Sequence, residues 1–366
     1  MIMKICYLSG ANSPHTVKWC KFFSNRGHEV HLISFDKGHI DNVIMHNIDL
    51  KVDSSSNRIK KIRYLFTFNR VRKLIKEIQP DIIHAHRATG YAFLAGVSKF
   101  HPYILSVWGS DVYDLPKNLM LKKFIQYNLN KADYIFSTSK AMKSQVQKLL
   151  ITNKEIILTP FGVDINAFKP LNKVKNNDKI IIGTIKTLNP KYGIDILIKA
   201  FKIVKDSDIN VDIELQIAGK GEQEKELKKL CRELNLEQNV KFLGYLNQKE
   251  VIDTFNKFDI AVFPSTFESF GVAAVEAQAC GVPVIVSNVG GLPEATAPNY
   301  SSILVEKENP DQLAKEIIKL VNNHDLRKEM SKNAREFVEK TYNIEDNFGS
   351  VETVYKKIIN EKLVRS

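Results

Sequence analysis

Cysteine is scarce in this chain of 366 residues. The four present (Cys6, Cys20, Cys231 and Cys280) show no C-x-x-C spacing and have no histidine pair beside them. Such scattered cysteines argue against a disulfide framework and against a zinc site, and we expect them to be reduced core residues. No apolar run reaches the roughly 18 to 20 residues that a membrane-spanning helix needs. The start of the chain also lacks the basic region and cleavage site of a secretion signal, which predicts a cytoplasmic protein.

Acidic residues are few in the first half of the chain. Residues 1–170 contain 25 Lys and Arg against 12 Asp and Glu, whereas the remaining residues contain 28 against 29. The formal net charge of +12 therefore comes from the first half. An anionic partner would meet that half.

The length and the hydrophobic pattern predict two α/β domains. A chain of 366 residues exceeds what one hydrophobic core usually supports. Short β-branched runs alternate with longer amphipathic stretches in both halves, which is typical of βαβ units around parallel sheets. Strands are expected at Lys4–Leu8, Val30–Ser34, Asp81–His84, Tyr103–Val107, Tyr134–Ser137, Ile156–Thr159, Ile180–Ile185, Leu215–Ala218, Val240–Leu243, Ile260–Phe263, Val282–Val286 and Ile303–Val305. We predict domains at residues 1–170 and 171–344, with a last helix, 345–366, that packs back on the first domain.

Two glutamates, Glu268 and Glu276, stand out in a segment of small residues. A buried strand is expected to end before Glu268, and a helix to begin near Gly271, where backbone N–H groups can bind a phosphate or a sugar hydroxyl. Glu276 falls about two turns inside that helix and is flanked by alanines, an apolar setting that a solvated glutamate rarely has. The carboxylates are too far apart to share one proton and suit two hydroxyl-bearing groups of one extended ligand. Taken as an isolated pair, two glutamates at this spacing would be better explained as a helix cap and a residue of a solvated face, and it is the apolar context of Glu276 that favours a ligand site.

This segment resembles the E-x7-E motif of the retaining nucleotide-sugar glycosyltransferases of family 4. That family has the GT-B fold, in which two Rossmann-like domains face each other across a cleft. The following segment, Cys280–Glu294, resembles the family's G-x-P-V-I-x-[ST]…G-G-x-x-E continuation. The resemblance implies that Glu268 holds the hydroxyls of the transferred sugar and that Glu276 holds the ribose hydroxyls. It also implicates the donor-binding backbone at Ser269, Phe270, Gly271 and Val272.

A second resemblance concerns cations and glycines that precede this motif. Segment 183–197 resembles the family's G-R-L…K-G-x-x-x-L pattern, which implies that Lys186 and Lys191 grip the donor's diphosphate. Lys186 stands where the family usually has arginine, so the charge is kept but the bidentate fork is lost. Two solvated lysines in a loop are the alternative. Two further strand ends resemble the family's G-x-G and F-x-G segments beside the base and implicate Gly219, Gly244, Tyr245 and Leu246.

Segments of the first half resemble the family's P-D-[IV]-[IV]-H-x-H and H-G-x-D patterns, which face the cleft. They implicate His86, grouped with the catalytic residues Glu268, Lys186 and Lys191, and Asp111 as a contact to donor sugar or acceptor. His15, after the first strand, is a further candidate. His84 is interpreted as a satisfied core histidine. Trp108 stands where the family more often has histidine.

A basic segment offers a hypothesis about the acceptor. Residues 54–76 contain eight Lys and Arg and no acid, interleaved with aromatic and aliphatic residues, and Leu119–Gln126 extends the pattern. That composition suits anionic lipid headgroups and a polyprenyl-diphosphate-linked acceptor on the inner membrane face; an ordinary solvated basic face is the alternative. Nucleic-acid binding is not expected, because no recognition motif accompanies the charge.

Together with the resemblance, these features predict a hexosyltransferase. It would move a sugar from a nucleotide-diphosphate sugar, expected to be a UDP-sugar, to a hydroxyl of a glycan or lipid-linked acceptor in bacterial surface polysaccharide synthesis. Two fixed cations can stabilise a leaving diphosphate without a metal, so neither a metal nor a cofactor beyond the nucleotide sugar is expected. A nucleotide-sugar epimerase of the same fold and a non-catalytic, nucleotide-sugar-binding subunit are the alternatives.

Overall fold

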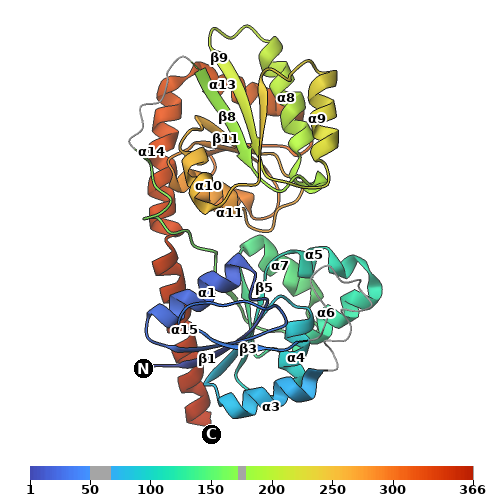
Figure 1. Ribbon diagram of the computed structural model, residues 1–366, viewed down its shortest axis with the longest axis vertical. Helices are drawn as coiled ribbons and strands as arrows, with labels where there is room; N and C mark the ends of the chain where they lie inside the picture. Colours follow the sequence, from blue (N-terminus) through green and yellow to red (C-terminus); the bar gives the residue numbers. More distant parts are fainter. Residues whose placement is uncertain (50–66, 172–178, 366) are drawn as a thin grey trace. The chain divides into compact units, whose positions relative to one another are not determined.

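The computed structural model describes residues 1–49, 67–171 and 179–365. The chain forms two compact units, one of Met1–Pro160 with Phe348–Ser366 and one of Phe161–Asn347, here called unit 1 and unit 2 (Figure 1). Most of the predicted basic segment 54–76, namely residues 54–66, lies outside the described residues.

Unit 1 is built on a seven-stranded sheet in the order β3-β2-β1-β4-β5-β6-β7, in which every neighbouring pair is parallel. The strands are β1 (Lys4–Leu8), β2 (Glu29–Ser34), β3 (Ile44–Asn47), β4 (Ile82–His86), β5 (Tyr103–Val107), β6 (Tyr134–Ser137) and β7 (Ile156–Leu158). The helices are α1 (Pro14–Asn25), α3 (Phe68–Ile78), α4 (Gly90–Ser98), α5 (Ser110–Tyr113), η2 (Leu115–Lys117), α6 (Leu119–Lys131), α7 (Lys140–Leu149) and α15 (Ile344–Arg365). Central parallel strands are covered on both faces, which is why they form nearly continuous apolar runs.

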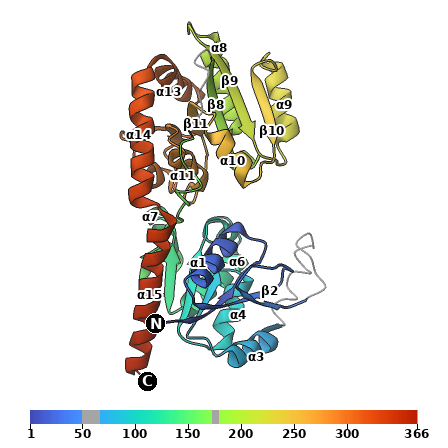
Figure 2. The same ribbon diagram turned by 60° about the vertical axis from the view of Figure 1, so that its left-hand side comes forward.

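The alternation of side chains along β1 shows the two faces of this sheet. Cys6 and Leu8 belong to the core that α3, α4, α6 and α7 cover. Tyr7 points to the opposite face, where its ring lies 6.3 Å from that of Trp19 on α1. On that face α15 packs against α1, with the Phe348 and Trp19 rings 4.8 Å apart (Figure 2).

Unit 2 has a six-stranded parallel sheet in the order β10-β9-β8-β11-β12-β13. Its strands are β8 (Lys179–Ile185), β9 (Asp212–Ala218), β10 (Val240–Gly244), β11 (Ile260–Phe263), β12 (Val284–Ser287) and β13 (Ser302–Val305). Its helices are η3 (Pro190–Tyr192), α8 (Ile194–Asp206), α9 (Glu224–Glu233), α10 (Gln248–Phe255), α11 (Val272–Ala279), α12 (Leu292–Thr296), α13 (Pro310–Asn322) and α14 (His324–Thr341). The strands and α8, α9 and α13 share one apolar core.

Both sheets reverse their strand order beside the first strand of the unit, between β1 and β4 and between β8 and β11. In open parallel sheets, ligands bind outside the carboxyl ends of the strands at such a reversal. The fold therefore directs attention to the residues that follow β8 and β11 in unit 2, and β1, β4 and β5 in unit 1. The predicted α/β class with two parallel sheets is confirmed.

Candidate functional site

Two of the predicted residues meet where the strand order of unit 2 reverses. Lys186 directly follows β8, and Glu268 follows β11. The Nζ atom of Lys186 lies 2.5 Å from Oε2 of Glu268, and the two side chains are only 15% and 10% exposed. The other oxygen, Oε1, accepts a hydrogen bond from the Ser269 amide at 3.2 Å. The structure thus brings together the predicted diphosphate-binding cation and the predicted sugar-binding carboxylate.

The charges around Lys186 favour its protonated form. Burial alone would lower the pKa of Lys186, but the Glu268 carboxylate, Tyr192 and Glu276 outweigh it and raise that pKa above the usual value. Glu276, a half-buried carboxylate on the second turn of α11, makes the smallest of these three contributions to the raised pKa of Lys186. A protonated lysine paired with a carboxylate suits the recognition of a ligand with both anionic and hydroxyl groups.

Tyr192 is a site residue that the sequence patterns did not reveal. The Nζ atoms of Lys186 and Lys191 lie 4.5 and 5.1 Å from the centroid of its ring. The electron-rich ring attracts both ammonium groups and keeps two like charges at one place. The only signal in the sequence is the position of Tyr192 between Lys191 and Gly193, inside the lysine pattern.

Backbone contacts fix the loops that hold these side chains. The Lys191 carbonyl accepts a hydrogen bond from the Thr266 amide at 2.9 Å, which ties the η3 turn to the loop that leads to Glu268. Gly219 has φ +132°, and a Cβ atom there would lie 1.9 Å from the Lys186 carbonyl oxygen. Gly219 also donates to the carbonyl of Gly244 at 2.7 Å. These two predicted glycines therefore shape the backbone around Lys186.

The backbone of Gly290 and Gly291 packs closely against the backbone of Glu268. Gly290 has φ +52°, and a Cβ atom there would lie 1.7 Å from the Glu268 carbonyl oxygen. The Gly291 amide donates to that oxygen at 3.2 Å. Only residues without side chains allow the loop to approach the strand–helix turn so closely.

The remaining predicted donor residues lie in two places in unit 2. Gly271 caps α11, and Val272 begins it. The Phe270 side chain is buried against Tyr342, with ring centroids 5.3 Å apart, and so fixes the turn before α11. Its backbone immediately precedes Gly271, the cap of that helix. Tyr245 is 73% exposed after β10, and Leu246 beside it is half-buried.

The predicted residues of unit 1 form a group of their own beside β1, β4 and β5. His86 is completely buried. Its Nδ1 lies 3.1 Å from the Ser9 Oγ, which is 2.7 Å from the Thr16 Oγ1. Burial, assisted by His15, lowers the pKa of His86 to about 3, so the ring is neutral near pH 7.

Trp108 covers this group of histidines. Its ring lies 4.6 Å from that of His86 and 5.5 Å from that of His15. Burial, with a contribution from Lys18, lowers the pKa of His15 to about 4. The tryptophan that departs from the family pattern therefore shields two neutral imidazoles.

Asp111 and His84 have structural partners. The Asp111 carboxylate is fully buried and accepts hydrogen bonds from the backbone amides of Ala88 at 2.8 Å, Gly109 at 2.8 Å and Trp108 at 3.2 Å. It therefore ties the loop after β4 to the loop after β5, and its expected contact with donor sugar or acceptor stays a prediction. His84 bonds to the Tyr355 hydroxyl and to Ser106, as expected of a satisfied core histidine.

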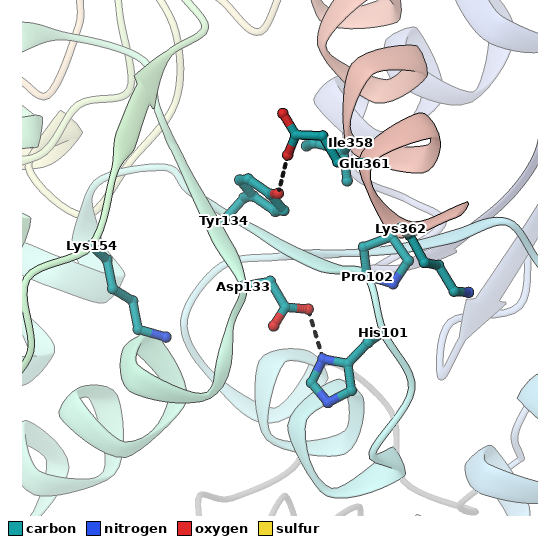
Figure 3. Close-up of a pocket in the computed structure, with 8 residues that line it drawn as sticks. All are labelled: His101, Pro102, Asp133, Tyr134, Lys154, Ile358, Glu361 and Lys362. Carbon is teal, nitrogen blue, oxygen red and sulfur yellow. Dashed lines mark hydrogen bonds and ion pairs between the residues drawn. The ribbon is translucent and has the colours of Figure 1, made fainter. Parts of the chain in front are cut away.

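A separate pocket of about 540 Å³ lies at the other edge of the unit 1 sheet, near the amino ends of β5 and β6 (Figure 3). Its charged groups pair with one another: His101 Nδ1 lies 2.7 Å from the Asp133 carboxylate, and the Tyr134 hydroxyl donates to Glu361 at 3.2 Å. The first pair joins the loops that precede β5 and β6, and the second links β6 to α15, which gives these groups a structural explanation.

Among the described residues no group of three or more His, Cys, Asp or Glu could hold a metal ion, and no helix is long and apolar enough to cross a membrane.

Comparison with known proteins places these residues in a wider context. Residues 4–139 match the family described as glycosyl transferase 4-like, and residues 167–337 match glycosyl transferases group 1. An uncharacterized glycosyltransferase of Methanocaldococcus jannaschii is 31% identical over 319 residues, which is 85% of each chain. The N-acetyl-alpha-D-glucosaminyl L-malate synthase of Bacillus anthracis is 25% identical over 97% of this chain and 96% of its own. The capsular polysaccharide biosynthesis glycosyltransferase CapM of Staphylococcus aureus is 26% identical over 93% of both.

Solved structures show the same fold. The sucrose-phosphate synthase of Thermosynechococcus elongatus superposes on this chain with a TM-score of 0.86 at 19% sequence identity. The match covers 98% of this chain and 100% of the synthase chain. The HepE protein of Anabaena, in complex with UDP-glucose, superposes with a TM-score of 0.75 at 19% identity over the whole of both chains.

Proposed function

Since the chain belongs to the family 4, group 1 glycosyltransferases and has their GT-B fold, we propose that it transfers a hexose from a UDP-sugar, with retention of configuration, to a hydroxyl of a glycan or lipid-linked acceptor. The observation that carries the proposal is the Lys186–Glu268 pair with Tyr192 and Lys191 beside it at the strand-order reversal of unit 2. One relative, the capsular polysaccharide biosynthesis glycosyltransferase CapM, supports the acceptor class.

Each part of the donor is assigned to different residues of unit 2. Lys186 and Lys191 bind the diphosphate, Glu268 accepts hydrogen bonds from the sugar hydroxyls, and Glu276 accepts those of the ribose. The exposed Tyr245 and its neighbour Leu246 lie beside the base. The complex of HepE with UDP-glucose supports a UDP-sugar as the donor.

The reaction requires stabilisation of a leaving diphosphate. The bond between the anomeric carbon and the diphosphate oxygen breaks while a bond to the acceptor oxygen forms on the same face of the sugar. The acceptor's proton passes to the leaving phosphate oxygen, so no protein base is needed. The lysines stabilise the charge that develops on the diphosphate, a contribution that replaces a metal ion.

Unit 1 is assigned to the acceptor. His86 is neutral, completely buried and bonded to Ser9, so in this reaction it positions Ser9 and Trp108 and does not transfer a proton. The excess positive charge of unit 1, including the exposed Arg70, Arg72, Lys73 and Lys76 of α3, favours an acceptor with anionic phosphates on a membrane surface.

The test is a donor screen followed by a transfer assay. Binding of UDP, GDP and their glucose, N-acetylglucosamine and mannose conjugates is measured by calorimetry. The tightest donor is then incubated with lipid-linked acceptors, and with no acceptor. Transfer to an acceptor with retained configuration supports the proposal. Conversion of the donor alone into its epimer, or donor binding with no transfer to any acceptor, refutes it.

A further inference from the structure

The outer face of α6 in unit 1 has an unusual composition. Five of its residues are exposed, and they are Leu119, Met120, Lys123, Tyr127 and Lys131. At helical spacing these positions form one stripe along α6. The stripe contains three apolar or aromatic side chains, two lysines and no acid.

The apolar side chains of this face are largely exposed to solvent. Leu119 is 70% exposed, Met120 80% and Tyr127 41%. Ile151, which follows α7, is 73% exposed and joins Tyr127, Lys123 and Lys131 around a groove of about 360 Å³. Single exposed apolar residues are ordinary, but a contiguous group of them marks an interaction surface.

A side-chain cap orders the first turn of α6, which carries Leu119 and Met120. The Asn118 side chain accepts hydrogen bonds from the amides of Met120 at 3.0 Å and Leu121 at 3.2 Å and so caps the helix. Leu119 and Met120 therefore project from an ordered first turn. They belong to the connection that leaves the carboxyl end of β5 through α5 and η2, and Ser9 and His86 meet at the carboxyl ends of β1 and β4 in the same sheet.

The charge around this face has one sign. Helices α6 and α7, which contact each other, contain six lysines and no Asp or Glu in their 23 residues, Leu119–Lys131 and Lys140–Leu149. Acids near the helix ends are already engaged: Asp114 pairs with Lys117 at 3.2 Å, and Asp133 with His101 at 2.7 Å. The field in front of the face therefore attracts anions.

We infer that the α6 face, made of Leu119, Met120, Lys123, Tyr127, Lys131 and Ile151, docks on an anionic lipid bilayer. The apolar side chains enter the boundary between headgroups and acyl chains, tyrosine occupies the interface, and the lysines extend to the phosphates. Each lysine near an anionic surface adds to the attraction, and salt weakens it. None of these six residues belongs to the predicted basic segment 54–76. The docking itself does not depend on the proposed function. Only its purpose does, which is the delivery of a lipid-linked acceptor to unit 1.

The alternatives fit the face less well. A solvated lysine face does not explain the exposure of Leu119 and Met120. A nucleic-acid surface needs several bases stacked on aromatic side chains, and among the exposed residues of α6 the only aromatic one is Tyr127.

Flotation of the full-length protein with vesicles tests the inference. The vesicles are phosphatidylcholine alone, or phosphatidylcholine mixed with phosphatidylglycerol, at low and high salt. The wild type is expected to float with the anionic vesicles at low salt and to be released as salt rises. Replacement of Leu119 and Met120 by serine, and separately of Lys123 and Lys131 by glutamate, is expected to weaken this binding by about tenfold or more.

Matched controls separate the face from general charge and from the proposed activity. Lys315→Glu with Lys328→Glu makes the same change in net charge on two exposed lysines of unit 2 and is expected to float like the wild type. Donor binding by the α6 variants is expected to equal that of the wild type, so a failure of the donor site is seen independently. The inference is overturned if the wild type ignores anionic vesicles, if the α6 variants float unchanged, or if the face instead retains RNA or a protein and no lipid.

Discussion

Lys186 and Glu268 form a largely buried ion pair, with 2.5 Å between Nζ and Oε2, although the proposed function gives them different parts of the donor. A diphosphate beside Lys186 competes with Glu268 for the ammonium group. A sugar hydroxyl beside Glu268 then replaces the bond that the carboxylate gives up. A donor that carries both groups satisfies both partners, whereas UDP alone leaves Glu268 without its cation. The pair therefore favours the intact nucleotide sugar over the nucleotide product.

Replacement of Glu268 by glutamine is expected to separate product binding from turnover. The variant removes the competitor for Lys186, so the affinity for UDP should rise by about tenfold, since charged hydrogen bonds contribute about 1.5 to 3 kcal/mol. Transfer should fall by about 10² to 10³, because the charged contact to the sugar is lost in the transition state. Calorimetry with UDP and initial rates of transfer measure the two effects. Unchanged turnover in the variant, with wild-type UDP affinity, contradicts the assignment of Glu268.

Lys186→Met and Lys186→Arg form a pair of tests for the diphosphate cation. Methionine keeps the apolar stem without the charge and leaves Glu268 unpaired, so donor affinity should fall by about tenfold or more, and thermal stability should decrease. Arginine keeps the charge and adds a fork that matches a phosphate. It should therefore retain most of the activity. Equal loss in both variants would show that the shape of the lysine, and not its charge, is what matters.

Tyr192 is expected to act through the two lysines on its ring. Tyr192→Leu removes both cation–π contacts, each about 0.5 to 1 kcal/mol at a partly exposed site, and should raise the KM for the donor by about tenfold with a smaller change in kcat. Tyr192→Phe keeps the ring and should stay close to the wild type. The salt dependence of donor binding gives a second readout, because freed lysines are more strongly screened. A phenylalanine variant as impaired as the leucine variant would assign the effect to the hydroxyl.

Gly290→Ala tests the support of Glu268 by the loop after β12. The new Cβ would lie 1.7 Å from the Glu268 carbonyl oxygen at φ +52°, so the loop or the strand–helix turn must shift. A displacement of about 1 Å at a catalytic group costs about 10²-fold in rate. Gly349→Ala is the matched control, since a Cβ there meets nothing within 4 Å and α15 gains a better helix former. Transfer rates of the two variants, with their melting temperatures, decide whether the loss is local.

The strands could be predicted from the sequence where they are apolar, and less well where they carry charge. Eleven of the predicted strands lie within two residues of the observed limits at both ends, whereas β9 begins at Asp212 and not at Leu215. Its charged start is stabilised because Glu214 pairs with Lys179 at 3.1 Å and Lys241 at 3.0 Å on the neighbouring strands. The edge strand β3, only Ile44–Asn47, was missed, because two of its four residues are polar and it has no long apolar run.

The same limit applies to the site. The motif residues could be found because their spacing is characteristic, and the structure brings Lys186 and Glu268 together. The place of Tyr192 depends on how the η3 turn folds against the loop before Glu268, which no pattern of residue types encodes. The backbone partners of Asp111 come from two loops that are distant in sequence, at Ala88 and Gly109, so its structural role could not be predicted.

The buried His86 predicts how stability depends on pH. Its pKa is lowered to about 3 in the folded protein, against about 6.5 in an unfolded chain. Between these values the unfolded chain binds more protons than the folded one, so the stabilisation is complete above about pH 6.5 and is lost as the pH falls toward 3. His15, whose pKa is about 4, and His84, whose pKa is also lowered by burial, act in the same direction.

The melting temperature of the wild type should therefore fall as the pH drops below 6.5. His86→Gln removes one of these groups and should show a smaller fall, whereas His39→Asn, at a side chain that is 82% exposed, should follow the wild type. An identical fall in the His86 variant and the wild type would contradict this prediction. It would mean that His86 becomes protonated in the folded protein as easily as in the unfolded chain, despite its burial beside Trp108 and Ser9.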